Sequence, residues 1–333
     1  MTRDYPPAIG GISTHVKELV EALKETGVET EVYVGRNDIK TLLLPFDIPL
    51  KRYDLVHVQS LPYGAFVFGV PLVVTVHSPV LEEFAHYRKA LKVASIPAAA
   101  LEKVSLSRAS AILAVSEQSK DNLVGRYGLA PGRIEVVGNG VEFEKFAAAG
   151  AMRADGAERR MVVVSRLEAR KNVAEAIEAV SKLPAGSWHL DIAGTGSEMG
   201  MLANLAKRTC PEGAVGFLGR VDASALPSVY ARASIFLTTS NSEGFGLSLL
   251  DAMSSGCACV VSDIPAHRAL IDNGANGVIY RDETDLVEVL RELLRSPERA
   301  RALGDAAKVA AKDRTWSSVA NRVSEAYRRV APA

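Results

Sequence analysis

The sequence predicts an α/β protein built from two Rossmann-like domains with parallel sheets. Short runs of β-branched residues alternate with segments of helical periodicity along all 333 residues. The predicted strands are nearly continuous in Val, Ile and Leu, which is typical of parallel strands covered by helices on both faces. Ten such strands are many for one sheet, and the chain length also favours two domains.

The predicted strands fall into two groups of five, separated by a weakly periodic segment. They are residues 31–35, 54–58, 72–77, 111–115 and 134–137, then 161–165, 188–193, 215–219, 234–238 and 258–262. The separating segment, residues 146–160, is rich in Ala and Gly, as linkers are. We therefore expect a first domain over 1–148 and a second domain over 157–314. Residues 315–333 are expected to form a helix that packs back on the first domain.

Helical periodicity is clearest near the start of the chain. One apolar stripe is formed by Val16, Leu19, Val20 and Leu23. Ser13 or Thr14 is the expected helix cap, and Gly10 and Gly11 directly precede the helix.

The composition indicates a globular protein with local binding sites. Thirty-nine basic and 39 acidic side chains leave no net charge, which argues against a nucleic-acid partner. The longest apolar run, residues 65–76, is short for a bilayer span and contains Pro71, and the first residues do not resemble a signal peptide. The protein is therefore expected to be cytoplasmic. The three cysteines fit buried thiols, and we assign them no chemistry.

The most informative motif is residues 243–251, Glu-Gly-Phe-Gly-Leu-Ser-Leu-Leu-Asp. An apolar strand runs into it and helical spacing follows it, so its glycines are predicted at a strand-to-helix turn. Such a turn directs free backbone N–H groups at an anion, and glycine lets a phosphate approach closely. Glu243 and Asp251 could hydrogen-bond hydroxyl groups on either side of that phosphate. The alternative is an ordinary helix start with an acidic surface residue.

Several further motifs occur in a recognisable order. They are Tyr5-Pro6-Pro7 with Gly10-Gly11 and His15, Val74-Thr75-Val76-His77, Ala114-Val115-Ser116, Val137-Gly138-Asn139-Gly140-Val141, Ser165-Arg166-Leu167 with Lys171-Asn172, and Gly194-Thr195-Gly196-Ser197. With the 243–251 motif they resemble the retaining glycosyltransferases of family 4 over nearly the whole chain. The resemblance implies the GT-B fold, in which two Rossmann-like domains face an interdomain cleft. Relatives begin with an apolar strand, whereas this chain offers only Met1-Thr2-Arg3-Asp4, so the first strand is expected to be missing.

The resemblance implies a nucleotide diphosphate sugar as donor, with uridine as the expected base. It also implies that the domain 157–314 binds this donor and that the domain 1–148 is the acceptor side. Arg166 and Lys171 follow the strand 161–165, where Arg can fork two phosphate oxygens and Lys can act as a point charge. An exposed basic loop is the alternative. Asp251 stands where the family has Glu, and it is shorter by roughly 1.5 Å, so its ribose contact is expected to be moved or weakened. The full expected donor set is Gly10, Gly11, Arg166, Lys171, Gly194, Glu243, Gly244, Phe245, Gly246, Leu247 and Asp251.

The catalytic residues implied by the resemblance are His77, Glu243, Arg166 and Lys171, with His77 near the reacting sugar. His15, Ser116 and Asn139 are expected to line the cleft. No Asp-x-Asp pair follows a strand, so we expect no metal and no cofactor. The motifs nominate no nucleophile, which favours attack on the face that the diphosphate leaves. His57 is interpreted as a core residue, and Gln59, where relatives often have His, is given no catalytic role.

Two other functions compete with glycosyl transfer. The glycine-spaced turn after residues 188–193 could bind NAD in an oxidoreductase, but its spacing is not G-x-G-x-x-G and no acidic residue follows at the expected distance. The second alternative is a GT-B protein that binds nucleotide sugars without transferring them.

The expected acceptor is a glycan, a small molecule or a lipid-linked glycan. A basic cluster in the helical region after residue 77 could contact the inner face of an anionic membrane, although a solvated helix face is the alternative. The cluster is Arg88, Lys89, Lys92, Lys103 and Arg108.

Overall fold

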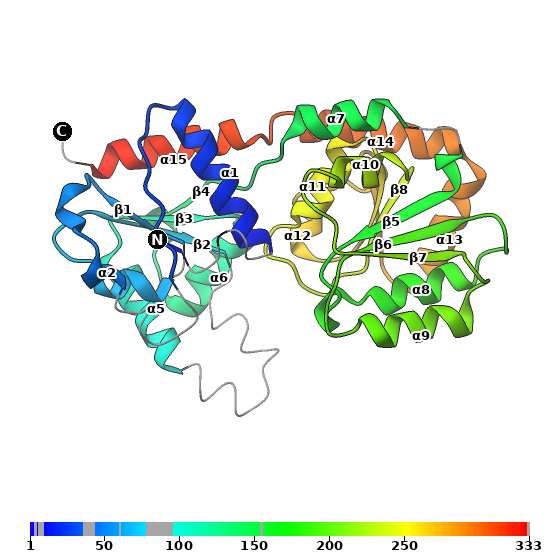
Figure 1. Cartoon of the computed structure of the whole chain (residues 1–333), viewed down its shortest axis with the longest axis horizontal. Helices are drawn as coiled ribbons and strands as arrows, with labels where there is room; N and C mark the ends of the chain where they lie inside the picture. Colours follow the sequence, from blue (N-terminus) through cyan, green and yellow to red (C-terminus); the bar gives the residue numbers. More distant parts are fainter. Residues whose placement is uncertain are drawn as a thin grey trace. The chain divides into compact units, whose positions relative to one another are not determined.

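The computed structural model describes residues 1–2, 5, 10–35, 44–59, 61–77, 96–153 and 156–331, which form two compact units (Figure 1). Unit 1 comprises Met1–Gly140 and Trp316–Ala333, and unit 2 comprises Val141–Thr315. The sequence placed the boundary between residues 148 and 157. Helix α7 (Phe143–Ala151) instead packs against α10 (Leu226–Ala231) and α11 (Leu247–Ser254), so the chain enters unit 2 directly after Gly140.

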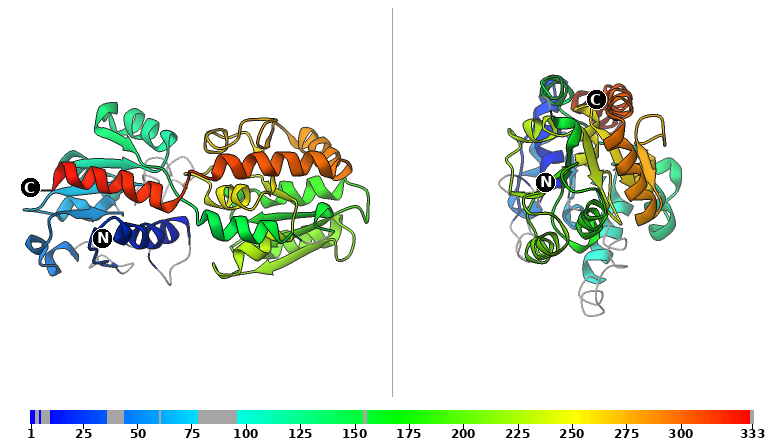
Figure 2. Two further views of the ribbon diagram at one scale, coloured as in Figure 1. Left: turned by 90° about the horizontal axis from the view of Figure 1, so that it is seen from above. Right: turned by 90° about the vertical axis from the view of Figure 1, so that its right-hand side faces the viewer.

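Unit 1 contains a four-stranded parallel sheet in the order β1-β2-β3-β4. The strands are β1 (Val56–Val58), β2 (Leu72–Val76), β3 (Ala111–Ala114) and β4 (Ile134–Val136). Its α-helices are α1 (Gly11–Glu25), α2 (Leu44–Asp47), α5 (Ile96–Arg108), α6 (Glu117–Tyr127) and α15 (Trp316–Val330). Short 3-10 segments lie at Leu50–Arg52, Leu61–Phe66 and Pro131–Arg133. The C-terminal helix α15 packs on α1, as the two views in Figure 2 allow the reader to follow.

Residues Met1 and Thr2 lie beside β1, although a first strand was expected to be missing. The Met1 carbonyl accepts from the Gln59 N–H at 2.8 Å, and Thr2 forms a parallel bridge with Val34. The predicted strand 31–35 is therefore wrong as a strand, because only Val34 pairs with the chain beside it. These two residues cover the backbone edge of β1, which would otherwise present unpaired groups.

Helix α1 begins earlier than the sequence predicted. Gly10 is its N-cap residue, with φ 148°, and no side chain caps the helix. Ser13 is buried inside the first turn, and the Thr14 N–H donates to the Gly10 carbonyl at 3.0 Å. The assignment of Ser13 or Thr14 as the cap was therefore wrong. Gly10 is favoured at this position because its φ lies in a region that side chains rarely adopt.

Unit 2 contains a six-stranded parallel sheet in the order β10-β9-β8-β5-β6-β7. The strands are β5 (Arg160–Val164), β6 (His189–Ala193), β7 (Val215–Gly219), β8 (Ile235–Thr238), β9 (Ala258–Ser262) and β10 (Val278–Tyr280). The sequence analysis missed β10, because three residues behind an Asn- and Gly-rich turn leave almost no periodic signal.

Helices cover both faces of this sheet, which explains why its strands are mostly apolar (Figure 1). One core cluster packs residues of α8 (Val173–Ser181), α9 (Met199–Thr209) and α13 (Glu283–Arg295) against the strands. A second cluster on the other face uses α7, α10, α11 and α14 (Pro297–Ala311).

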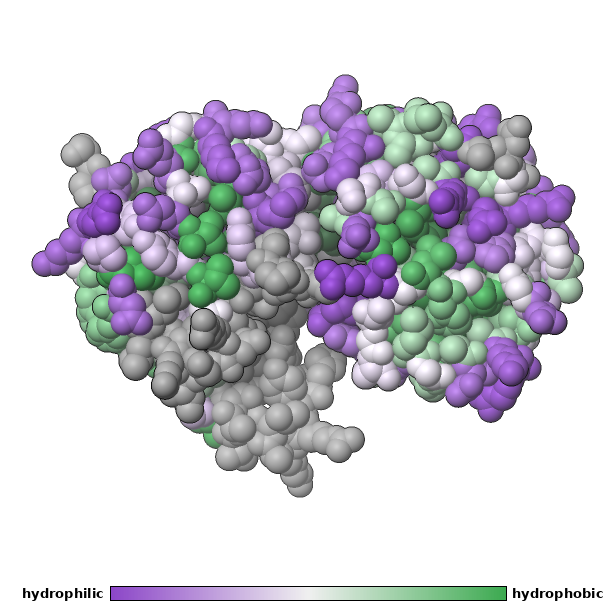
Figure 3. All heavy atoms as spheres, in the orientation of Figure 1, coloured by the Kyte–Doolittle hydropathy of each residue, from purple (hydrophilic) through white to green (hydrophobic). Residues whose placement is uncertain are grey.

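No helix among the described residues is both long enough and apolar enough to cross a bilayer. Hydrophilic and hydrophobic residues are interspersed on the visible face of each unit (Figure 3).

Candidate active site

The candidate site of unit 2 lies after two adjacent strands, β5 and β8, where their carboxyl ends share one edge of the sheet. Lys171, after β5, donates to the Glu243 carboxylate, after β8, and each of these side chains is only 10% exposed. Ser240 Oγ donates to the same carboxylate oxygen at 2.9 Å. Arg170 Nη1 lies 3.6 Å from the other carboxylate oxygen. The structure thus brings together two predicted residues, Lys171 and Glu243, and adds Arg170 and Ser240.

Backbone contacts fix the loops that carry this ion pair. Thr239 Oγ1 donates to the Asn172 carbonyl at 2.8 Å, and the Asn241 N–H donates to the Arg170 carbonyl at 2.9 Å. Arg170 Nη1 also donates to the Ser242 carbonyl at 3.1 Å. Asn172 has φ 48°, a conformation that Asn tolerates better than most residues, and it joins the Ala169–Lys171 turn to α8. The cationic loop and the carboxylate loop are therefore held as one structure.

Burial and charge act in opposite directions on the Glu243 pKa. Burial raises it, but Lys171, Arg170 and the Ser240 hydroxyl together outweigh burial and hold it below its usual value. Burial lowers the Lys171 pKa, the Glu243 carboxylate partly offsets that effect, and Arg170 and Arg166 add to the lowering. Glu243 is therefore kept as a carboxylate, which can accept hydrogen bonds from hydroxyl groups.

Arg166 extends the site as a half-exposed cation. Its Nη1 lies 2.7 Å from Glu168 Oε1, and Glu168 Oε2 lies 3.5 Å from Arg170 Nε. Arg166 was predicted to act with Lys171 and Glu243, and in the structure its ion-pair partner is Glu168. Three cations and two carboxylates form one chain of contacts, and its positive excess suits a diphosphate.

Gly194 and Gly196 allow two loops to approach closely. A Cβ on Gly194 would lie 1.7 Å from the Ser165 carbonyl oxygen, and one on Gly196 would lie 2.1 Å from the Leu167 carbonyl oxygen. The Leu167 N–H donates to the Thr195 carbonyl at 2.9 Å across this contact. These glycines are explained by backbone packing that positions the loop carrying Arg166, whereas the predicted donor contact of Gly194 remains a prediction.

The 243–251 motif forms the expected turn and helix. Gly246 is the N-cap of α11 with φ 93°, and Leu247 is the first helical residue. Phe245, after Gly244, packs partly against the second core cluster of unit 2. Asp251 lies inside α11, and its charge adds to burial in raising the pKa of Tyr230 well above its usual value. The motif therefore starts a helix at the same edge as the ion pair.

Sequence reasoning missed a buried histidine beside this turn. His267 lies in α12 (Pro265–Arg268), and its Nδ1 donates to the Ser262 carbonyl at 2.9 Å. Ser262 Oγ in turn donates to the Ser240 carbonyl at 2.6 Å. Burial lowers the His267 pKa, and the Glu243 charge partly offsets this effect. Its position directly after β9 was the signal that could have identified it.

In unit 1, three predicted residues meet at the carboxyl ends of the strands. His15 in α1 contacts Asn139 Oδ1 through its Nδ1, and the His15 and His77 ring centroids lie 4.6 Å apart in an edge-to-face arrangement. His15 is one helical turn from Gly11 at the start of α1. Ser116 instead caps α6 by accepting from the Ser119 N–H at 3.1 Å.

Some predicted residues lie outside the described part of the chain. They are Pro6, Pro7, Arg88, Lys89 and Lys92. Within the described part, no three His, Cys, Asp or Glu side chains are grouped so that they could hold a metal ion.

Sequence comparison identifies two family matches that together span both units. Residues 149–310 match Glycosyl transferases group 1, and residues 38–145 match Glycosyltransferase Family 4. A GDP-mannose:cellobiosyl-diphosphopolyprenol alpha-mannosyltransferase of Xanthomonas campestris is 31% identical over 84% of this chain and 74% of its own length. A glycogen synthase of Mycobacterium tuberculosis is 28% identical over 83% of this chain and 69% of its own length.

Solved structures show the same fold over almost the entire chain. Anabaena Alr3699/HepE in complex with UDP and glucose has a TM-score of 0.79 at 19% identity and covers 98% of both chains. WaaG, described as a glycosyltransferase involved in lipopolysaccharide biosynthesis, has a TM-score of 0.76 at 15% identity and covers 100% of this chain and 99% of its own. The expected GT-B fold is thus confirmed. Together with the sequence matches, these similarities establish that the chain belongs to the glycosyl transferases group 1, within glycosyltransferase family 4.

Proposed function

We propose that this glycosyltransferase moves a hexosyl group from a nucleotide diphosphate sugar to a hydroxyl acceptor with retention of anomeric configuration. The observation that carries the proposal is the buried Lys171–Glu243 pair, linked through Arg170 and Glu168 to the half-exposed Arg166. In the proposal, the diphosphate of the donor binds Arg166 and Lys171. The Glu243 carboxylate then accepts hydrogen bonds from hydroxyl groups of the donor sugar.

Charge stabilisation of the departing diphosphate is the main catalytic demand. Arg166, Arg170 and Lys171 supply positive charge, and the first N–H groups of α11 add the positive end of a helix dipole. We therefore expect turnover to continue after EDTA treatment and dialysis. A loss of turnover in EDTA that added Mg²⁺ or Mn²⁺ restores would contradict this part of the proposal.

Binding of the donor is tested by thermal shift with UDP, GDP and ADP and with their sugars. Specific binding raises the unfolding temperature, and the stabilisation grows with the logarithm of the ligand concentration above Kd. The family resemblance favours UDP, whereas the name of the Xanthomonas relative includes GDP-mannose, so the screen separates two named candidates. Lys171→Met should abolish the shift, and Lys182→Met, at an exposed ion pair of the same unit, should preserve it. An equal thermal shift in both variants would show that Lys171 does not bind the donor.

Transfer is separated from mere binding by release of the nucleotide diphosphate when donor and acceptor extract are both present. A protein that binds the donor but releases nothing with any extract would be the non-transferring GT-B protein considered above. The anomeric configuration of the product, read by NMR, tests retention. Trapping of a glycosyl-enzyme ester in a slow variant would contradict front-face attack.

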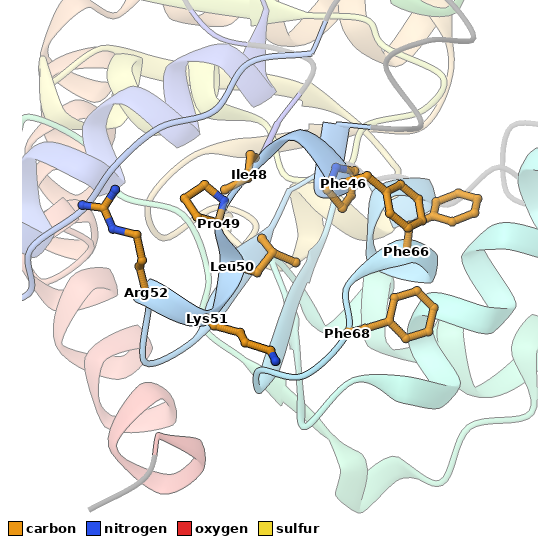
Figure 4. Close-up of a pocket in the computed structure, with 9 residues that line it drawn as sticks. Phe46, Ile48, Pro49, Leu50, Lys51, Arg52, Phe66 and Phe68 are labelled. Carbon is orange, nitrogen blue, oxygen red and sulfur yellow. The ribbon is translucent and has the colours of Figure 1, made fainter.

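A membrane-bound acceptor is part of the proposal, because an aromatic and basic face lies on unit 1. A shallow depression of about 480 Å³ gathers Phe46, Phe66 and Phe68 on one side, and Figure 4 shows Arg52 directed to the opposite side. Phe46 is 62% and Phe68 52% exposed, and the Arg108 guanidinium lies 4.0 Å from the Phe68 ring centroid. Exposed aromatic rings beside cations suit the interface of an anionic bilayer.

In this proposal the protein is cytoplasmic and binds the membrane surface through this face, which vesicle co-sedimentation tests. The wild type should bind phosphatidylglycerol-containing vesicles and not phosphatidylcholine vesicles. Phe46→Ser combined with Phe68→Ser should lose this binding, whereas Met152→Ser, at an exposed apolar residue of unit 2, should keep it. Equal binding by the double variant and the wild type would contradict the role of this face.

A further inference from the structure

A continuous line of polar side chains runs from α15 to the end of β2 in unit 1. The Tyr327 hydroxyl lies 2.5 Å from His57 Nδ1, and His57 Nε2 lies 2.7 Å from Thr75 Oγ1 and 3.3 Å from Gln59 Nε2. Gln59 Oε1 then lies 2.8 Å from His77 Nε2. Gln59, which the sequence analysis gave no catalytic role, therefore joins the two histidines directly.

The amide of Gln59 gives this line a direction. Its oxygen can only accept a hydrogen bond, so His77 must carry a proton on Nε2 to donate to it. Its nitrogen can only donate, so the facing His57 nitrogen must hold a lone pair, and the His57 proton lies on Nδ1 toward Tyr327. Rotating the amide by half a turn would reverse both tautomers together. One side chain therefore couples the protonation pattern of two imidazole rings.

Both rings are neutral in this arrangement. Burial lowers the pKa values of His57 and His77 well below the usual value, and the neighbouring His15 ring lowers each further. Among the described residues, the groups facing the pair include His15, Thr75, Tyr327 and the Met1 amino group, whose charge also lowers the His57 pKa; none of these is a carboxylate that would favour a charged ring. A neutral ring has one donor and one acceptor nitrogen, so the tautomer determines what His77 offers a ligand.

We propose that Gln59 is a positioning residue that holds His77 in the tautomer with the proton on Nε2, leaving Nδ1 as a hydrogen-bond acceptor. The inference rests on the proposed function in one respect: it takes the ligand of His77 to be a hydroxyl group of the donor sugar. In that role His77 accepts the hydroxyl hydrogen and orients the sugar, and it does not supply a positive charge. Its position depends on Gln59 and, behind it, on His57 and Tyr327.

The tautomer is measured on the free protein, independently of turnover. Long-range ¹H–¹⁵N spectra of histidine-labelled protein distinguish a protonated ring nitrogen from one with a lone pair, and His77→Asn assigns the His77 signals among the six histidines of the chain. The expected result is a proton on Nε2 of His77 and on Nδ1 of His57. The opposite pair of tautomers, or a charged His77 at neutral pH, would overturn the proposal.

Substitutions of Gln59 test the coupling. Gln59→Met removes both hydrogen bonds, so both His77 tautomers should become populated and kcat should fall on the order of 10²-fold. Gln59→Glu keeps an acceptor facing Nε2, so His77 should keep a proton on that nitrogen. Gln118→Met makes the same chemical change in α6 of unit 1 and should leave the His77 signals unchanged. Unaltered His77 signals in Gln59→Met would refute the positioning role.

Measurements of donor affinity and of kcat distinguish the role of Gln59 from the proposed glycosyl transfer. Donor affinity measured by thermal shift should be similar in Gln59→Met and the wild type, because the cation chain is formed by residues of unit 2. If the tautomer follows the prediction but no sugar is transferred by the wild type, the proposed function fails and the tautomer assignment stands. If the wild type transfers sugar and Gln59→Met does so at the same kcat, the positioning role fails.

Discussion

Replacing Glu243 with Gln should destabilise unit 2 more than replacing its partner Lys171 with Met. After Lys171→Met, the Glu243 carboxylate still has Ser240 Oγ at 2.9 Å and Arg170 Nη1 at 3.6 Å. After Glu243→Gln, the Lys171 ammonium keeps its charge in a buried position and has lost its ion-pair partner, while Arg170 and Arg166 still repel it. The Glu243 carboxylate therefore keeps favourable contacts when its partner is removed, whereas the Lys171 ammonium does not.

The contacts allow a rough estimate of this difference. A charge pair at 3.6 Å, the Arg170–Glu243 separation, contributes about 4–5 kcal/mol at an effective dielectric constant near 20. Solvent reduces that value, because the Arg170 side chain is 35% exposed. Lys171→Met should thus cost about 2 kcal/mol, the usual cost of one lost charged hydrogen bond. Glu243→Gln should cost about 3–5 kcal/mol, as when one partner of a buried pair is removed.

The assay is urea unfolding of both variants, followed by a probe in unit 2. Lys182→Met, whose ion pair with Glu283 is exposed, should lose less than about 1 kcal/mol and serves as the control. In Glu243→Gln, stability should also recover as the pH rises toward 10.5, the usual Lys value. The reason is that the folded state has the lower Lys171 pKa and releases its proton first. If Glu243→Gln were as stable as Lys171→Met, the reasoning from residual contacts would be refuted.

Three other predictions concern stability. Burial lowers the His15 pKa to about 4 from the usual 6.5, so His15 alone should make unit 1 less stable by about 3 kcal/mol as the pH falls from 6.5 to 4. His57 and His77, whose pKa values burial also lowers, should add to this loss. In urea unfolding, His15→Gln should therefore reduce the pH dependence of stability, and His189→Gln should not. Gly196→Ala places a methyl group against the Leu167 carbonyl and should lower the unfolding temperature of unit 2. Gly200→Ala in α9, which has open space around it, should instead raise stability by about 1 kcal/mol. Equal effects of the two substitutions would show that Gly196 does not lie close to the Leu167 carbonyl. Arg153→Met removes donors to the Ser255 and Gly256 carbonyls, at 2.8 and 2.9 Å, and should cost about 2 kcal/mol in urea unfolding; no loss would mean that these carbonyls are satisfied by solvent.

The sequence was sufficient for those parts of the fold whose signal is local. Runs such as Met161–Val164 and Ala258–Ser262 are apolar on both faces, and only a buried parallel strand explains that pattern in so short a segment. Strand β10 could not be predicted because its three residues leave almost no periodic signal, and the bridge at Val34 could not be predicted because its partner, Thr2, is far away in the chain. Residues 143–148 were assigned to the first domain and residues 149–151 to the linker, because the Ala-rich sequence of α7 looks like a linker when its contacts with α10 are not known.

The candidate site shows the same division between residue identity and pairing. The loop after β5 was predicted to be cationic, and Lys171 was placed beside Glu243 by motif alone. Which arginine reaches the Glu243 carboxylate depends on how the Ala169–Lys171 turn is held by the 239–243 loop, and that geometry selects Arg170 over Arg166. The hydrogen bonds that join His57, Gln59 and His77 could not be predicted from the sequence, because they form only when β1 and β2 lie side by side in the sheet.

The two ends of unit 2 meet in a parallel bridge between Val141 and Thr315, and the Val141 N–H donates to the Arg314 carbonyl at 2.9 Å. Unit 2 is therefore inserted into the sequence of unit 1, and its first and last residues are paired with each other. A gene fragment encoding residues 141–315 would begin and end at two residues that are adjacent in the structure. Removing this segment would cut through no strand of either sheet. Residues 141–315 could therefore be replaced as one segment while the sheet of unit 1 stays continuous.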